Sequence, residues 1–416
     1  MKLVKMSLAC AMLMSASAFA IDNLKVTGNL ELYYNTDNLD GQGKDGLFDR
    51  ETSIGDTALR LNVTGDIMEN LSFGIGGDIV STLGLEREIV TGSWANRDKT
   101  GNKIDDAVWI GDLWMEGKVA KTTAKVGRME FDSPFIFSEK WSVVPNTFTA
   151  AVLTNTDIAD TTLIGAYVGQ GNGLNVGGSA NSSTAGWDYM ASGGSFGTFA
   201  ADGAYTVGAI NNSFKPLVAQ AWYFDVKDMM NAYWLQADWD CQLVKNVKLG
   251  AQYASMNTKG ASSAQADSSA YAFKVAYEGI ENLKLTAAYS SVDDDGYYKI
   301  ANVATDNTGR YSGDGKFGAQ SKLYTEEWWN YGYVGAAGAD TVTLSTEYDA
   351  GFVKLYAQYT DVKNTAKDVK MNEATLTAFK SFGPLDVLLE LISADATDQN
   401  AGKRYETFQT LFTLHF

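Results

Sequence analysis

Residue types on which enzymes commonly depend are scarce in this chain of 416 residues. Histidine occurs once, as His415, which is next to the C-terminus and poorly placed to act as a hydrolytic base. The glycine cluster GQGNG at residues 169–173 is not followed by a helical pattern, so it does not indicate a phosphate-binding loop. The sequence shows no nucleotide fingerprint and no metal-ligand motif. We therefore expect no enzymatic activity and no required cofactor.

Long apolar runs are missing after the first twenty residues, whereas a spanning helix needs about 18 or more apolar residues in a row. The first twenty residues contain two lysines, an apolar stretch and an A-x-A sequence formed by Ala18 and Ala20. This order is typical of a cleaved signal peptide, so we expect a signal peptide at 1–20 and a mature domain at 21–416. Cleavage would remove one of the two cysteines and leave Cys241, which excludes an internal disulfide.

Positive charge is also in short supply. The chain has 33 lysines and arginines against 50 aspartates and glutamates, which gives a formal charge of −17. Loss of Lys2 and Lys5 with the signal peptide would take this value from −17 to −19. Proteins bind nucleic acid by neutralising its phosphates, so we expect no nucleic-acid partner.

Proline is rare, with four residues, whereas 50 residues are aromatic. Proline cannot donate to a strand ladder, so its scarcity suits a chain made mostly of strands. The C-terminal stretch FQTLFTLHF alternates in character, and large apolar side chains share one face (Phe408, Phe412, Leu414 and Phe416). Alone, this stretch fits an edge strand of a soluble β-sandwich. It also fits the last strand of an outer-membrane barrel, whose terminal aromatic resembles the signal read by the barrel-assembly machinery.

The same alternation recurs along the chain, and the connections between alternating segments differ systematically in length. The short connections are 66–70, 120–122, 156–160, 211–215, 241–246, 279–282, 349–351 and 382–385. The long ones are 36–56, 82–105, 132–146, 170–202, 258–269, 293–340, 362–371 and 396–403, and 227–230 is short where a long one is due. Eight turns and nine loops join eighteen strands. Weak patterns at 203–210, 372–381 and 386–395 leave sixteen as the alternative.

Short turns at one end and long loops at the other are the pattern of a bacterial outer-membrane barrel. A β-sandwich does not require this asymmetry. The sequence therefore predicts an all-β fold, an antiparallel transmembrane β-barrel with short periplasmic turns and long extracellular loops. It would lie in the outer membrane, among lipid and lipopolysaccharide.

A family likeness lies within residues 123–253, about a third of the chain. KVGRMEFDSPFIFSEKWSVVPNTFTAAVLTN is followed by DTTLIGAYVGQGNG and then by KPLVAQAWYFD, YWLQADW and GAQY. These motifs resemble the outer-membrane porin D superfamily, and most of all the Campylobacter-type major outer membrane porins. The resemblance implies an 18-stranded homotrimer that passes ions and small hydrophilic solutes. It also implies a third outer loop that folds inward.

The third outer loop, 132–146, is rich in aromatic residues, among them Trp141. Shortly before it lies Arg128, a basic residue that falls on the apolar face of the alternating pattern. Strict alternation would turn Arg128 toward lipid, where a guanidinium at the midplane costs about 2–4 kcal/mol. A bulge at Gly127 would turn it into the lumen instead. The predicted constriction comprises Arg128, Glu130, Asp132, Glu139 and Lys140.

Other charged residues have inward parity and are expected to line the pore. Four lysines lie close to tight turns and would ring the periplasmic mouth, where they could also be merely solvated: Lys125, Lys248, Lys284 and Lys354. The remaining lining residues are Arg60, Asp78, Asp112, Glu116 and Asp238.

The porin D pattern includes a row of basic residues that guides carboxylates, but only seven arginines occur here and they form no inward row. We therefore expect a general diffusion channel with a weak cation preference. A substrate-selective porin for small nutrients is one alternative. A barrel whose large extracellular loop, 293–340, serves adhesion is another. In that loop, the run of Asp293, Asp294 and Asp295 could ligate Ca²⁺ through its oxygens.

Overall fold

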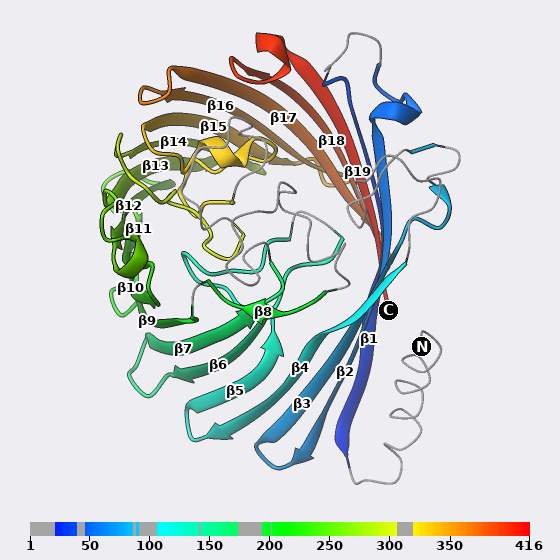
Figure 1. Cartoon of the computed structure of the whole chain (residues 1–416), viewed down its shortest axis with the longest axis vertical. Helices are drawn as coiled ribbons and strands as arrows, with labels where there is room; N and C mark the ends of the chain where they lie inside the picture. Colours follow the sequence, from blue (N-terminus) through cyan, green and yellow to red (C-terminus); the bar gives the residue numbers. More distant parts are fainter. Residues whose placement is uncertain are drawn as a thin grey trace.

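The computed structural model describes residues 21–39, 46–85, 89–90, 106–140, 143–173, 194–200, 202–305 and 319–416. Ala18, Ala20 and Trp141 lie outside these residues, as does the whole predicted signal peptide. Nineteen strands form one antiparallel sheet that closes on itself (Figure 1). One of them, β8, has two residues and pairs only with the end of β7, so eighteen strands make the wall.

The first strands are β1 (Asp22–Asp37), β2 (Ser53–Met68), β3 (Leu71–Ser81), β4 (Ala107–Val119), β5 (Thr122–Met129), β6 (Phe148–Asn155), β7 (Thr161–Gly171), β8 (Gly197–Thr198) and β9 (Ala204–Asn211). They are followed by β10 (Leu217–Val226), β11 (Met230–Asp240), β12 (Val247–Thr258), β13 (Ser268–Ile280) and β14 (Leu283–Val292). The last are β15 (Ala339–Asp349), β16 (Lys354–Asn364), β17 (Val369–Phe382), β18 (Leu385–Ala396) and β19 (Tyr405–His415). In the described residues of the connections there are four short 3-10 helices: η2 (Arg50–Thr52), η5 (Gly260–Ser262), η6 (Tyr331–Tyr333) and η7 (Asn400–Gly402).

The barrel is closed by the pairing of its first and last strands. Leu30 of β1 lies opposite Leu414 of β19 on one side and Leu59 of β2 on the other. The backbone of Phe416 completes the seam, because its N–H donates to the Gly28 carbonyl over 3.0 Å and its carbonyl accepts from Gly28 over 2.8 Å. Closure leaves no free sheet edge, as a sheet in lipid requires.

The predicted strand count of eighteen is confirmed, and the three weak patterns are the strands β9, β17 and β18. Within the described part of the chain, no helix is long and apolar enough to cross a membrane. Side chains alternate along the wall strands. On β15, for example, Leu344 is 53% exposed on the outer surface, whereas its neighbour Thr343 is 5% exposed on the inner one. The outer surface is therefore apolar and the inner one mostly polar.

The C-terminal residues predicted to act in assembly lie on this outer surface. Phe412 pairs with Leu32, Leu414 pairs with Leu30, and Phe416 is 55% exposed. Phe408, farther from the C-terminus, lies 5.5 Å from the ring of Phe48 between centroids.

The largest buried apolar cluster lies inside the ring of strands. It joins inward side chains of the wall mainly to two connections, the one between β5 and β6 and the one between β14 and β15, and it also includes Phe199 and Ala200 before β9. Figure 1 shows the described parts of both segments within the ring of strands. We call them the first inner loop (130–147) and the second inner loop (293–338). The lumen is therefore narrowed from two sides.

Candidate pore constriction

The first inner loop crosses the lumen from β5 to the wall formed by β10 and β11. Phe135 and Ile136 are 1% and 0% exposed. The ring of Phe135 packs edge-on against Phe224 of β10 and Trp234 of β11, with centroids 5.4 Å away in each case. Such edge-on aromatic pairs stabilise the packing beyond what the burial of apolar surface contributes. The aromatic residues of this loop thus anchor it across the channel.

The second inner loop leaves the wall at its outer end and folds back inside. Ile300 and Val334 are completely buried, and the Val303 N–H donates to the Phe135 carbonyl over 2.8 Å. The large extracellular loop predicted at 293–340 thus folds into the lumen in its described parts, 293–305 and 319–338. Apolar residues of this loop gain more by packing against the inner wall than by facing water.

A buried amide holds the two inner loops together. Asn302 accepts a hydrogen bond from the Phe137 N–H at 3.2 Å and donates to the Phe137 carbonyl at 2.9 Å. It also donates to the Glu139 carboxylate at 3.0 Å. Glu139 accepts further hydrogen bonds from the Thr305 hydroxyl and, at 3.2 Å, from the Gln320 N–H. Glu139 is 5% exposed and connects the two inner loops through these hydrogen bonds. The prediction that its side chain faces the pore is therefore wrong.

One cluster of charges lies between the first inner loop and strands β2 to β4. Arg60 pairs with Asp78 at 2.9 Å, with Glu130 at 3.2 Å and with Asp112 at 3.7 Å. Lys140 pairs with Glu130 at 2.7 Å. Three residues predicted from parity, Arg60, Asp78 and Asp112, are thereby brought to one site, together with Glu130 and Lys140 of the predicted constriction. We call these five residues the Arg60 cluster.

Glu130 follows the last residue of β5, and its basic neighbours in the Arg60 cluster determine its protonation state. Burial raises the pKa of Glu130, but the hydrogen bond from Lys140 and the charge of Arg60 outweigh it and hold the pKa below its usual value. Glu130 therefore stays ionised at neutral pH.

A second group of charges lies where the second inner loop meets the first inner loop and the wall. Lys322 pairs with Asp132 at 2.7 Å and lies 4.5 Å from the ring centre of Phe137. On the wall, Lys274 pairs with Asp238 at 2.7 Å, and Tyr324 donates a hydrogen bond to Asp238 at 2.8 Å. Lys274, Lys322 and Tyr324 are functional candidates outside the predicted set, although the parity of β13 does turn Lys274 inward. The two loop residues come close to the wall only through long-range packing.

Arg128 is not part of this site. The pairing of β4 with β5 runs without a shift through Gly127, so Arg128 lies opposite Leu113 on the outer surface. Its guanidinium donates to the Ile110 carbonyl at 3.1 Å and lies 4.1 Å from the ring centre of Phe196. The predicted bulge at Gly127 is therefore wrong, because these local partners satisfy an outward arginine.

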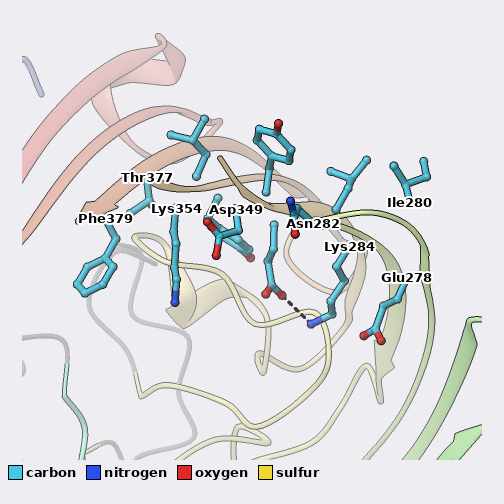
Figure 2. Close-up of a pocket in the computed structure, with 13 residues that line it drawn as sticks. Glu278, Ile280, Asn282, Lys284, Asp349, Lys354, Thr377 and Phe379 are labelled. Atoms are coloured by element: carbon cyan, nitrogen blue, oxygen red, sulfur yellow. Dashed lines mark hydrogen bonds and ion pairs between the residues drawn. The ribbon is translucent and has the colours of Figure 1, made fainter. Parts of the chain in front are cut away.

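The predicted lysines near the turns lie at the periplasmic mouth, and two of the four pair with acids. Lys284 pairs with Glu347 at 2.6 Å, beside a hollow that Lys354 also lines (Figure 2). Lys248 pairs with Glu278 at 3.0 Å. On the other side of the barrel, Lys125 lies opposite Glu116 and 3.9 Å from the ring centre of Trp114. The charges of Lys248 and Lys284 are therefore compensated locally.

The three consecutive aspartates do not gather around a common point. Asp293 accepts a hydrogen bond from Ser269 at 2.5 Å, and Asp294 accepts one from Thr365 at 3.1 Å. Among the residues that the structure describes, no three acidic, histidine or cysteine side chains form a group able to hold a metal ion. The suggested Ca²⁺ site at Asp293, Asp294 and Asp295 is therefore wrong.

Comparison with known protein families agrees with an outer-membrane barrel. Residues 74–363 match the outer membrane porin, OprD family. This match covers more than half of the chain, which therefore belongs to the OprD family of outer membrane porins. It is a channel of the bacterial outer membrane and not an enzyme. Comparison with curated proteins gives no match.

Several solved structures share the fold at low sequence identity. OccK8 (OprE) of Pseudomonas aeruginosa is 16% identical, with a TM-score of 0.71 over 95% of this chain and 98% of that one. OpdK of the same organism, solved with vanillate, is 14% identical, with a TM-score of 0.72 over 95% and 98%. OccK9 (OpdG) is 16% identical, with a TM-score of 0.71 over 95% and 99%. At these identities the likeness is one of fold.

Proposed function

We propose that this porin is a weakly selective diffusion channel that prefers cations. The main support is the Arg60 cluster, in which three carboxylates share two basic side chains, Arg60 and Lys140. An excess of fixed negative charge in a narrow aqueous passage raises the local concentration of cations.

The few described arginines favour the same conclusion. Of the four in the described residues, only Arg60 lies in the lumen between charged partners. Arg50 lies in η2, Arg128 faces outward, and Arg404 is near Asp395 at the outer end of β18, 3.8 Å away. Within the described chain there is thus no row of guanidinium groups to guide carboxylates along the wall.

Reversal potentials in a salt gradient test this proposal. We expect the purified protein in a planar bilayer to pass K⁺ more readily than Cl⁻, with a preference that weakens at high salt because the fixed charges are screened. Anion selectivity at low salt would refute the proposal.

Arg60→Ala is expected to strengthen the cation preference. The substitution leaves the carboxylates of Asp78, Asp112 and Glu130 with Lys140 as the one remaining basic partner. Because one charge acts with about 1 kcal/mol at 4 Å in water, the K⁺ to Cl⁻ permeability ratio should rise about fivefold. The same salt-gradient measurement checks it, and Lys215→Ala in a periplasmic turn, where Lys215 pairs with Asp160, is the control. A ratio unchanged by Arg60→Ala would remove the Arg60 cluster from the ion path.

Two other functions remain as competitors. A substrate-selective channel is supported by the shared fold of OpdK, which was solved with vanillate. Liposome swelling with sugars, amino acids and aromatic acids separates a selective channel from a general one. Adhesion by 293–340 is less favoured, because Ile300 and Val334 of that segment are completely buried.

We also keep the homotrimer as a proposal, supported by the Campylobacter-type motifs in 123–253. Lipid, lipopolysaccharide and the assembly machinery are the further partners proposed for the outer surface and the terminal strand. Light scattering in mild detergent that gives the mass of one chain would refute the trimer.

A further inference from the structure

The second inner loop is attached to the wall through a buried carboxyl group. Glu373 of β17 is 2% exposed and accepts hydrogen bonds from the backbone N–H groups of Trp329 and Asn330, each at 3.0 Å. It also accepts one from the Asn330 side chain at 2.8 Å. Three donors of the loop thus converge on one acid of the barrel.

A second acid of the loop lies beside this anchor. Glu327 is 3% exposed and lies close enough to Glu373 for the two carboxyl groups to interact directly. In the same part of the chain, no lysine or arginine forms an ion pair with either acid. Two adjacent buried carboxyl groups without a basic partner cannot both be ionised at small cost, so one of them must hold a proton.

The groups around this pair do not supply the missing positive charge. On the loop, Glu326 accepts a hydrogen bond from the Ser321 N–H at 2.9 Å. The charge of Glu139 in the first inner loop raises the pKa of Glu326, and the charge of Lys322 lowers it. On β18, Glu390 is 1% exposed and accepts from Thr377 at 2.8 Å.

On β19, Tyr405 donates to Asn330 at 3.1 Å and to Gln399 at 3.0 Å. Tyr333 of the loop donates to Asp398 at 2.7 Å. Apart from Lys322, which forms its ion pair with Asp132, these neighbours add acids and neutral hydroxyls. Burial raises the pKa of Glu327 well above its usual value, and the charge of Glu373 raises it further. Burial likewise raises the pKa of Glu326 well above its usual value.

We propose that residues 319–338 are a proton-controlled gate. They stay docked on β17 to β19 while the Glu327 and Glu373 pair holds a proton, and they move away from the wall when both acids are ionised. The docked loop binds more protons than the released one, so its docking is complete at pH values below the ordinary carboxyl range. Docking weakens as pH rises above that range. The gate goes beyond the proposed diffusion function and needs only that the barrel conducts.

Single-channel recording of the mature protein at pH values from about 4.5 to about 9 tests the gate. For one proton, the ratio of docked to released dwell times should fall by up to about tenfold per pH unit within the sensitive window. Glu327→Gln should reduce this dependence, and the double variant Glu327→Gln with Glu373→Gln should remove it. Glu69→Gln, an equal change at an exposed periplasmic turn, should keep it.

A reversible disulfide between the loop and the wall provides a second, independent test of the gate. The hydroxyls of Ser290 on β14 and Thr325 on the loop are 2.5 Å apart, so Ser290→Cys with Thr325→Cys, in a Cys241→Ser background, should allow a disulfide. Oxidation should abolish the pH dependence and reduction should restore it. An unaltered pH response in the oxidised channel, or a wild-type channel whose dwell times do not change with pH, overturns the gate. Lack of conductance at every pH would overturn the diffusion function together with it.

Discussion

Leu344→Arg is expected to destabilise the barrel by about 2–4 kcal/mol, because it places a guanidinium in the acyl-chain region. Leu344 lies on the outer surface of β15 between Ala287 of β14 and Tyr359 of β16, five residues before the end of its strand. At the rise of a tilted strand, that position is close to the middle of the membrane. Urea unfolding in lipid vesicles, followed by the change in electrophoretic mobility of unheated samples, gives the free energy of unfolding.

Ser345→Arg is the matched control, since it makes the same side chain at the next residue. Ser345 lies opposite Thr286 and Gln358 and faces the aqueous lumen. We expect a loss below about 1 kcal/mol there, with the main effect on ion selectivity. Equal losses for the two variants would show that alternation on β15 does not separate lipid from water.

The wall was predictable because each strand residue has only two environments. An outward side chain such as Leu344 faces lipid, and an inward one such as Thr343 faces the lumen. A period of two in the sequence therefore predicts the strands and which face of each strand is apolar. The periplasmic turns were also recognisable. Asn70, Asn246 and Asn282 occupy them with φ near +60°, a conformation that asparagine adopts more readily than most residues.

The inner loops were less predictable because their packing has no period. Acids such as Glu326 and Glu327 are usually solvated, and nothing local indicates that they are buried. The adjacent pair Trp328 and Trp329, followed by an apolar run, was the available signal that the second inner loop has a packed face.

The predicted position of Arg128 is wrong for another reason. Its predicted inward position came from the cost of a guanidinium in bare hydrocarbon. The Ile110 carbonyl and the Phe196 ring lower this cost, because the guanidinium donates to the carbonyl and lies over the ring. Conversely, Asp78, Asp112 and Glu130 were each proposed to face the lumen from sequence, but their convergence on Arg60 depends on the register of β2, β3 and β4.

Asn302→Ala is expected to release the two inner loops from each other. The amide is completely buried and makes the hydrogen bonds to Phe137 and Glu139 that join the loops. Its loss leaves buried backbone groups unpaired, at about 1–3 kcal/mol for each group. Docking of the first inner loop should therefore weaken by several kcal/mol, while the barrel wall stays intact.

The measurements for this variant are hydrogen exchange in 130–147 and single-channel recording. Exchange should accelerate about a hundredfold or more for amides protected by loop docking, and the channel should conduct more with frequent transitions. Asn155→Ala, which removes hydrogen bonds to Thr122 and Asp157 at a periplasmic turn, should leave both unchanged. If Asn302→Ala leaves exchange slow and the current quiet, the first inner loop is held by its aromatic anchor on β10 and β11 alone. In that case the channel width would be set by Phe135 and its partners, and the joint with the second inner loop would carry little of the docking free energy.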